Sequence, residues 1–321
     1  ERTDDNTISD LTASTTQSFG SGLGAGLSNA GEVLALDYEG EIFDQTPSIG
    51  SCNGWCGGLV PTRATMERID PDIVGTDISN WGTNNQIISN GHNVDGLTII
   101  GTPARRNSLN YLISQTSSLG VDTTLTQAKS PYLVDRDVTV PLGRILQVEA
   151  GVVIKFIGLY GLYIDGTLKL NGTAADPVVI TSFKDDMYGG DTNTDATSTL
   201  PQSQDWKSIE FRPGSSDDSL VDNAIVRYGG KFIQGSQAAR SLLTIDSVSP
   251  TIQNSIFENS FTYGLWLKNS TSTVQNNSIR NVSGATLTMP LGIYIQGGSP
   301  YILGNTISQN MNGLNIDANS V

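Results

Sequence analysis

The last third of the chain repeats a short pattern, and this repeat restricts the possible folds more than any other feature. An Asn-[Ser/Thr/Ala]-Ile unit recurs, and its later copies are followed by a Gly-[Leu/Ile]-x-[Leu/Ile] unit at 264–267, 292–295 and 313–316. The first unit begins at Asn223, Asn254, Asn277 and Asn305, with spacings of 31, 23 and 28 residues. These spacings fit solenoid coils of about 20–30 residues with variable loops, whereas helical repeats keep a fixed length.

The isoleucine and the asparagine of each unit have different predicted roles. We expect Ile256, Ile279 and Ile307 to point into the core of the coil. We expect the asparagine at the turn, where it tolerates left-handed backbone geometry and can bond the equivalent asparagine one coil along. Of the 24 asparagines, 11 fall between residues 250 and 321, where such ladders would run. The alternative is that asparagine marks ordinary turns.

Short apolar runs recur from about residue 132, with no helical pattern between them. They include 132–134, 145–148, 151–156 and 178–182. Parallel strands normally need crossover helices, but a coil of strands and turns avoids them by stacking each strand on its equivalent in the next coil. We therefore predict an all-β chain with a right-handed parallel β-helix over 132–321. No capping helix is visible near Val321, so we expect the β-helix to continue beyond that end.

The first third has a different texture. Residues 1–110 carry short strand-like runs such as 32–36 and 40–44, separated by clusters of turn residues, which is typical of a β-sandwich. Residues 111–131 are expected to form a linker. Arg105-Arg106, just before it, could mark a protease-sensitive exposed loop, and two solvated charges are the simpler interpretation. Cys52 and Cys56 could close a small disulfide loop in an oxidising compartment, or remain two free thiols.

Composition excludes some classes of protein. The formal net charge is −14, which disfavours nucleic acid as a partner because phosphate binding needs clustered Lys and Arg. No run of 18 apolar residues is present, so we expect no membrane span. The sequence contains no signal-peptide pattern and starts at Glu1, and we expect the chain to be a mature or trimmed fragment.

An acidic segment is the strongest candidate for a binding site. Its centre is Asp191-x-Asn193-x-Asp195, and alternating oxygen side chains in a tight loop converge on one cation, as in the first half of an EF-hand loop. Asp185, Asp186 and Asp205 complete the candidate ligand set. Hard oxygen ligands favour Ca²⁺ in a structural role. No Gly follows Asp195 and no Glu closes the loop, so a solvated acidic loop remains the alternative.

Two aromatic residues occupy matching positions in successive repeats. Trp266 and Tyr294 should stack on one face of adjacent coils and point outward, where they could bind carbohydrate. The alternative is that they form an aromatic cover beneath a loop.

Enzyme chemistry has weak support. The sole histidine, His92, lies in the first third, and no nucleophile elbow or metalloprotease motif is present. A group formed by Asp222, Arg227, Lys231 and Asp246 could line an outer face of stacked coils, but surface decoration is the simpler interpretation. We predict no catalytic residues.

Two family resemblances extend this interpretation. Residues 1–110 resemble the later part of a bacterial lamin-tail domain, an immunoglobulin-like sandwich. The matching stretches, in order, are 1–6, 27–32, 64–68, 75–77, 79–81 and 101–103. The first strands of that family are missing here.

Residues 132–321 resemble right-handed parallel β-helix repeat proteins of the pectate-lyase-like superfamily. The resemblance is carried by the runs 152–156, 165–168 and 176–182. It implies an extracellular, bacterial cell-surface setting and no particular chemistry.

The sequence therefore predicts a non-catalytic structural or adhesive module, secreted or attached to the cell surface, with a calcium-stabilised loop. The alternatives are a polysaccharide-acting lyase or hydrolase of the β-helix class and a self-assembling extracellular fibre or envelope-layer subunit. The expected partners are polysaccharide or cell-surface components, and self-association through open ends of the β-helix or sandwich is a further expectation.

Overall fold

The computed structural model divides into two compact units, Glu1–Gln115 and Thr116–Val321. It describes residues 30–59, 64–69, 74–84, 92, 96–102, 107, 117–193, 195, 197–231, 241–284 and 290–317. The Arg105-Arg106 pair lies outside these residues.

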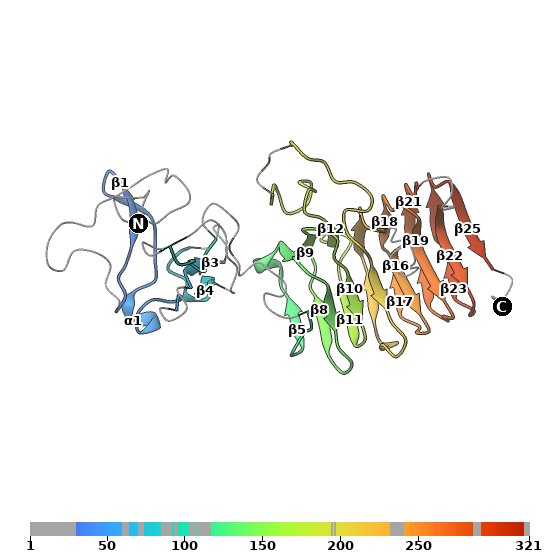
Figure 1. Cartoon of the computed structure of the whole chain (residues 1–321), viewed down its shortest axis with the longest axis horizontal. Coiled ribbons are helices and arrows are strands. Elements are labelled where there is room, and N and C mark those ends of the chain that lie inside the picture. Colours follow the sequence, from blue (N-terminus) through green and yellow to red (C-terminus); the bar gives the residue numbers. More distant parts are fainter. Residues whose placement is uncertain are drawn as a thin grey trace. The chain divides into compact units, whose positions relative to one another are not determined.

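The second unit is a parallel β-helix. Its described strands form three seven-stranded parallel sheets, and each of the seven coils gives one strand to each sheet (Figure 1). The first sheet comprises β5 (Thr123–Leu125), β8 (Ile145–Val148), β11 (Thr167–Asn171), β14 (Leu220–Asp222), β17 (Thr251–Gln253), β20 (Thr273–Gln275) and β23 (Tyr301–Leu303). The second comprises β6 (Tyr132–Val134), β9 (Val153–Phe156), β12 (Val178–Ser182), β15 (Ala224–Arg227), β18 (Ile256–Glu258), β21 (Ser278–Arg280) and β24 (Thr306–Ser308). The third comprises β7 (Val138–Val140), β10 (Leu162–Ile164), β13 (Ile209–Phe211), β16 (Ser241–Asp246), β19 (Tyr263–Lys268), β22 (Leu291–Gln296) and β25 (Asn312–Ile316).

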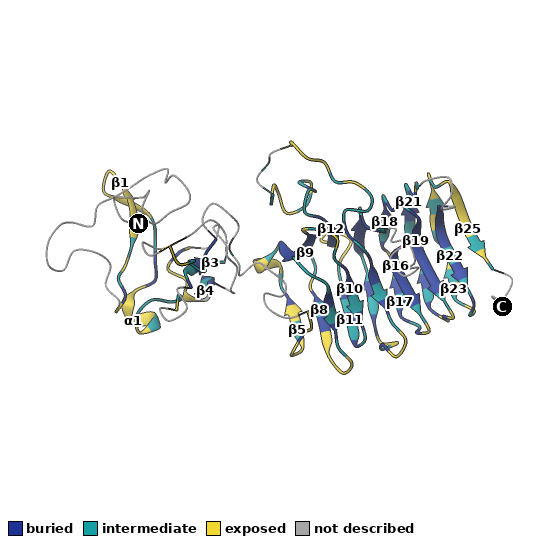
Figure 2. Cartoon of the chain, in the orientation of Figure 1, coloured by how far each residue is buried: buried dark blue, intermediate teal, exposed yellow. Residues whose placement is uncertain are grey.

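The coil interior is filled by apolar side chains that stand in register. On the third sheet one such row consists of Val140, Ile164, Phe211, Ile245, Leu267 and Ile295, each at most 2% exposed. Side chains alternate across a strand, so every second residue of each strand reaches this core. Full burial of one such side chain stabilises the fold by about 1.5–3 kcal/mol. The buried core runs along the middle coils (Figure 2).

The corners of the coils depend on residues with left-handed backbone geometry. Their φ angles lie between 47° and 77° at Asn223, Asn254, Asn276 and Gly304 after the first sheet, at Tyr228, Asn259, Asn281 and Gln309 after the second, and at Ser247, Asn269 and Gly297 after the third. Asparagine and glycine adopt this geometry at low cost, which explains the richness of asparagine in the last coils.

An asparagine ladder runs beside the first of these corners. The Oδ1 of Asn305 accepts from the backbone N–H of Asn277 at 2.9 Å, and the Oδ1 of Asn277 accepts from the N–H of Ser255 at 2.9 Å. One coil earlier the Ser255 hydroxyl replaces the amide and accepts from the N–H of Ala224 at 3.0 Å. The predicted ladder is therefore present between Asn277 and Asn305, with serine in its earlier position.

The predicted inward position of Ile256 is wrong. Phe257 pairs with Ile279 and is fully buried, whereas Ile256 pairs with Ser278 and lies on the outer face. The cause is that asparagine occupies two different positions, one residue apart, in successive coils. Asn254 is the left-handed corner residue of its coil, equivalent to Asn276 and not to the ladder residue Asn277.

The β-helix unit also includes part of the segment expected to be a linker. β5 pairs with β8, and η5 (Gln127–Lys129) connects β5 to β6. The first coil therefore starts before residue 132.

The first unit contains two antiparallel pairs among its described residues. β1 (Ala35–Tyr38) pairs with β2 (Glu41–Gln45), and β3 (Met66–Arg68) pairs with β4 (Trp81–Thr83). The helix α1 (Ile49–Cys52) leads into a disulfide between Cys52 and Cys56, and η3 (Ile78–Asn80) precedes β4. The immunoglobulin-like sandwich of the lamin-tail type stays a prediction.

Candidate metal site over the second sheet

The long connection between β12 and β13 lies against the outer face of the second sheet. We call residues 183–205 the cover loop, which Figure 1 draws as the long loop above β12. Lys155 of β9 is fully buried, and its Nζ donates to the carbonyl of Gly190 at 2.6 Å and to Thr192 Oγ1 at 3.0 Å. A buried ammonium is tolerated only when its donors are satisfied, so these bonds fix the middle of the loop.

An apolar contact also fastens the cover loop. Tyr188 packs on a cluster of Val153, Val179 and Ile225, which Ile256 extends. These residues come from β9, β12, β15 and β18, so Tyr188 packs on a row of outward apolar residues supplied by successive coils.

A charged ladder lies beside this cluster. Asp185 is 2% exposed, accepts from Thr181 Oγ1 at 2.6 Å and lies 3.6 Å from Arg227 Nε. Arg227 Nε lies 3.2 Å from Glu258, which Arg280 contacts at 2.7 Å. Burial acts to lower the pKa of Arg227, but Asp185, the Tyr228 hydroxyl and Glu258 together raise it above its usual value. Arg227 therefore stays charged and joins the loop to two coils.

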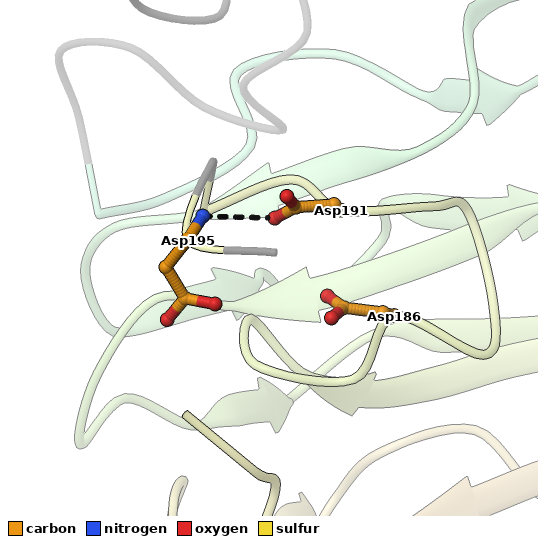
Figure 3. A group of neighbouring side chains, drawn as sticks. All are labelled: Asp186, Asp191 and Asp195. Atoms are coloured by element: carbon orange, nitrogen blue, oxygen red, sulfur yellow. Dashed lines mark hydrogen bonds between the residues drawn. The ribbon is translucent and has the colours of Figure 1, made fainter. Parts of the chain in front are cut away.

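Three carboxylates of the cover loop converge beyond this ladder. Ligand oxygens of Asp186, Asp191 and Asp195 lie within 4.8 Å of one another, and the backbone N–H of Asp195 donates to Asp191 Oδ1 at 3.2 Å (Figure 3). Among the described residues neither Asp186 nor Asp195 forms a salt bridge, and their Oδ1 atoms are buried without a hydrogen-bond partner. Buried carboxylate oxygens without donors are costly, which makes a bound cation a physical solution.

The other candidate ligands have different surroundings. Asp185 faces Arg227, and Asp205 accepts from Ser182 Oγ at 2.7 Å and Lys184 Nζ at 2.9 Å. Asn193 Nδ2 donates to Asp195 Oδ2 at 2.9 Å, so Asn193 turns its amide nitrogen, and not its carbonyl oxygen, toward the carboxylates. The carbonyl oxygen would take that place only after an amide flip. The structure thus brings together Asp186, Asp191 and Asp195, with Asn193 beside them.

The paired aromatic residues of the third sheet are in contact. Trp266 and Tyr294 stack with ring centroids 5.9 Å apart and an interplanar angle of 24°, and Tyr263 packs on both. Trp266 is only 1% exposed and Lys268 Nζ lies 5.3 Å from its ring, whereas Tyr294 is half-buried. The burial of Trp266 favours the aromatic-cover interpretation over an open sugar platform.

The group considered for catalysis is not assembled on one face. Asp222, Arg227 and Asp246 belong to β14, β15 and β16, which lie in three different sheets. His92 lies in the first unit, where it forms an isolated bridge with Thr98.

Sequence reasoning missed three residues that hold the cover loop, either directly or, for Glu258, through Arg227. Lys155, Tyr188 and Glu258 make contacts that depend on which sheet face the loop covers. One signal was available, because Lys155 interrupts the apolar run Val152–Phe156 one coil before a long insertion. A charged residue at that place predicts a polar partner outside the strand.

Comparisons with known proteins agree with the solenoid. A family model described as a right handed beta helix region matches residues 213–321. Protein bark beetle of Drosophila melanogaster is 36% identical over 81 residues, which are 25% of this chain and 3% of that protein. A search of the solved structures finds no match. The predicted β-helix repeat is confirmed, and the described helices include none long and apolar enough to span a membrane.

Proposed function

We propose that this chain is a non-catalytic structural or adhesive module of an extracellular surface protein. The observation that carries the proposal is the continuous core of the β-helix, which links seven coils through three hydrogen-bonded sheets. Such a stack forms a stiff, protease-resistant spacer because each coil is held by its neighbours. The proposed setting is a bacterial cell surface, with a lamin-tail-like domain preceding the β-helix.

We further propose that Ca²⁺ stabilises the cover loop through Asp186, Asp191 and Asp195. Two oxygens bound to one Ca²⁺ at 2.3–2.6 Å are at most about 5 Å apart, and the three carboxylates satisfy this limit within 4.8 Å. Three acidic groups at such distances repel one another, and a divalent cation removes that repulsion. The ion would supply no chemistry beyond fixing the loop against β9 and β15.

Thermal melting of the purified chain tests the calcium proposal. At about 100 times the dissociation constant a specific ligand adds about 2.7 kcal/mol, so we expect Ca²⁺ to raise the β-helix transition by about 5–10 °C over a chelated sample. Replacing Asp186, Asp191 and Asp195 by Asn should abolish the shift. Asp218→Asn, at an exposed turn outside the cover loop, is the matched control. An equal Ca²⁺ response in the triple variant would exclude the site.

The enzymatic alternative is tested separately. Because Asp222, Arg227 and Asp246 lie in different sheets, we expect no turnover of acidic polysaccharides with or without Ca²⁺. Release of unsaturated or reducing ends at a rate proportional to protein concentration would overturn the non-catalytic assignment. Surface location is tested by protease shaving of intact source cells, which should remove the protein without lysis.

A further inference from the structure

The outer face of the third sheet carries a row of alternating charges. Asp165, Arg212, Asp246 and Lys268 occupy equivalent positions of coils two to five, one after another. Their side chains are exposed by 38%, 37%, 21% and 28% respectively, so all four reach solvent. We call these four residues the charge row.

The charge row is unlike the outward rows of the other two sheets. On the first sheet the corresponding row is Glu149, Asn171, Asp222, Gln253, Gln275 and Leu303, whose two charges are both negative and lie two coils apart. On the second sheet the cover loop buries Lys155 and Arg227. The third sheet therefore presents the one alternating and accessible row among the described strands.

Pairing within the chain explains part of this alternation. Arg212 lies 3.7 Å from Asp165, and Lys268 lies 2.5 Å from Asp246, so neighbouring coils avoid like-charge contacts. Each carboxylate still has free lone pairs and each cation further donors, because partly exposed groups keep water on their open side. A second set of partners can therefore be added without breaking the first.

The order of the charges is self-complementary under one symmetry operation. A two-fold axis that lies in the contact plane, parallel to the strands and midway between β13 and β16, makes two β-helices antiparallel and sets coil two opposite coil five and coil three opposite coil four. Every contact then joins opposite charges. Moving the axis by half a coil to either side opposes Arg212 to itself or Asp246 to itself, and a parallel arrangement opposes each residue to itself.

The ends of the row do not interfere with this arrangement. The equivalent position of coil one is Pro141 and that of coil six is Gln296. Both are uncharged, and the same axis sets them opposite each other. Coil seven carries Asp317 at this position, and the axis sets it opposite none of the four residues of the charge row. One register is therefore favoured, and an isologous contact of this kind closes as a dimer.

We propose that a second copy of this chain docks antiparallel on the charge row. Asp165 meets Lys268 of the partner subunit, and Arg212 meets Asp246 of the partner subunit. The contact is lateral, and it differs from association through the ends of the β-helix. Partly exposed ion pairs are individually weak and are screened by salt, so the dimer forms reversibly and is favoured at low ionic strength. The inference is independent of the calcium proposal.

Charge reversal with mixing tests the dimer. We expect sedimentation of the full chain at high concentration to show a dimer in about 0.05 M salt that dissociates in about 0.5 M salt. Asp165→Lys alone and Lys268→Asp alone should each be monomeric at low salt, because each opposes like charges across the contact. An equimolar mixture of the two variants should form a heterodimer, because the two substituted positions then face each other with opposite charges. Circular dichroism and thermal melting of each variant check that it is folded.

The mixing arm separates a docking role from a role within the chain. Each reversal also disturbs an ion pair of its own chain, but mixing cannot repair a defect inside a single chain. A monomer at low salt, self-association that both reversals leave unchanged, or variants that stay monomeric when mixed would each overturn the proposal.

Discussion

Charged side chains beneath the cover loop have partners that compensate their burial. Arg227 stands between Asp185 and Glu258, and its guanidinium also lies 4.5 Å from the Tyr228 ring. A buried pair adds little to stability relative to an apolar replacement, but removal of one partner leaves the other uncompensated. The cost of a substitution here depends on what remains.

Arg227→Ala should therefore be severe. Asp185 and Glu258 are 2% and 7% exposed, and their charges would lose the cation between them. We expect the free energy of unfolding to fall by about 3–5 kcal/mol, measured by chemical denaturation. Arg280→Ala is the matched control, because Arg280 also contacts Glu258 but is 41% exposed, and it should cost at most about 1 kcal/mol. Equal losses would contradict the ladder.

Glu210 should make the stability of the fold depend on pH, with a sign opposite to that of a carboxylate in an ion pair. Burial raises its pKa above the ordinary value of 4.5, while Arg212 and Lys268 only partly oppose this effect. Because the pKa is higher in the folded state, its contribution to stability is full below the unfolded-state pKa and is lost as pH rises through the folded value. Glu210→Gln should therefore raise the melting temperature at neutral pH and change it little near pH 4.

Melting at both pH values checks this expectation. Glu149→Gln, at an exposed position of the same unit, provides the control and should shift neither transition. A lower melting temperature for Glu210→Gln at neutral pH would show that the ionised carboxylate stabilises the fold.

At the scale of the strand and its corner, removing a residue of the asparagine ladder should measurably lower the free energy of unfolding. Asn277 is 2% exposed, and its Nδ2 donates to the Ile252 carbonyl and to Asn305 Oδ1, both at 3.0 Å. Its Oδ1 accepts from the backbone N–H of Ser255. Asn277→Ala should lower the free energy of unfolding by about 2–4 kcal/mol, because several buried backbone groups lose their partners. Asn276→Gly should change it by less than about 1 kcal/mol, since Asn276 has a φ of 57° that glycine also adopts. Denaturant titration of both variants distinguishes them.

The same corner shows how far sequence could predict these elements. Apolar runs and repeat spacing predict the strands, because a period of two and a turn signal are local properties. The register of Ile256 against Phe257 is not local: one letter, Asn, serves both as the left-handed corner residue and as the ladder residue. The spacing of 23 residues between Asn254 and Asn277 spans this change of role, whereas equivalent residues such as Thr251 and Thr273 are 22 apart.

The candidate site was predictable to a similar extent. Alternation of oxygen side chains identifies Asp191 and Asp195 as neighbours, since both lie in one tight segment. The exclusion of Asp185 and Asp205 from the cluster depends on Arg227 and Lys184, whose positions follow from the folded stack. Long-range partners of this kind are set by coil geometry, which a single sequence does not specify.

For the whole molecule, the described strands of the β-helix pair only with one another, from β5 to β25. Stability in such a stack is a sum of coil contributions and contacts between neighbouring coils. A chain restricted to residues 116–321 should therefore keep the β-helix transition of the full chain, together with its response to Ca²⁺. Differential scanning calorimetry of both chains provides the measurement. If the shorter chain lost its cooperative transition while remaining soluble, the first unit would have to contribute to the fold of the second, and the division at residues 115 and 116 would not mark an independent folding unit.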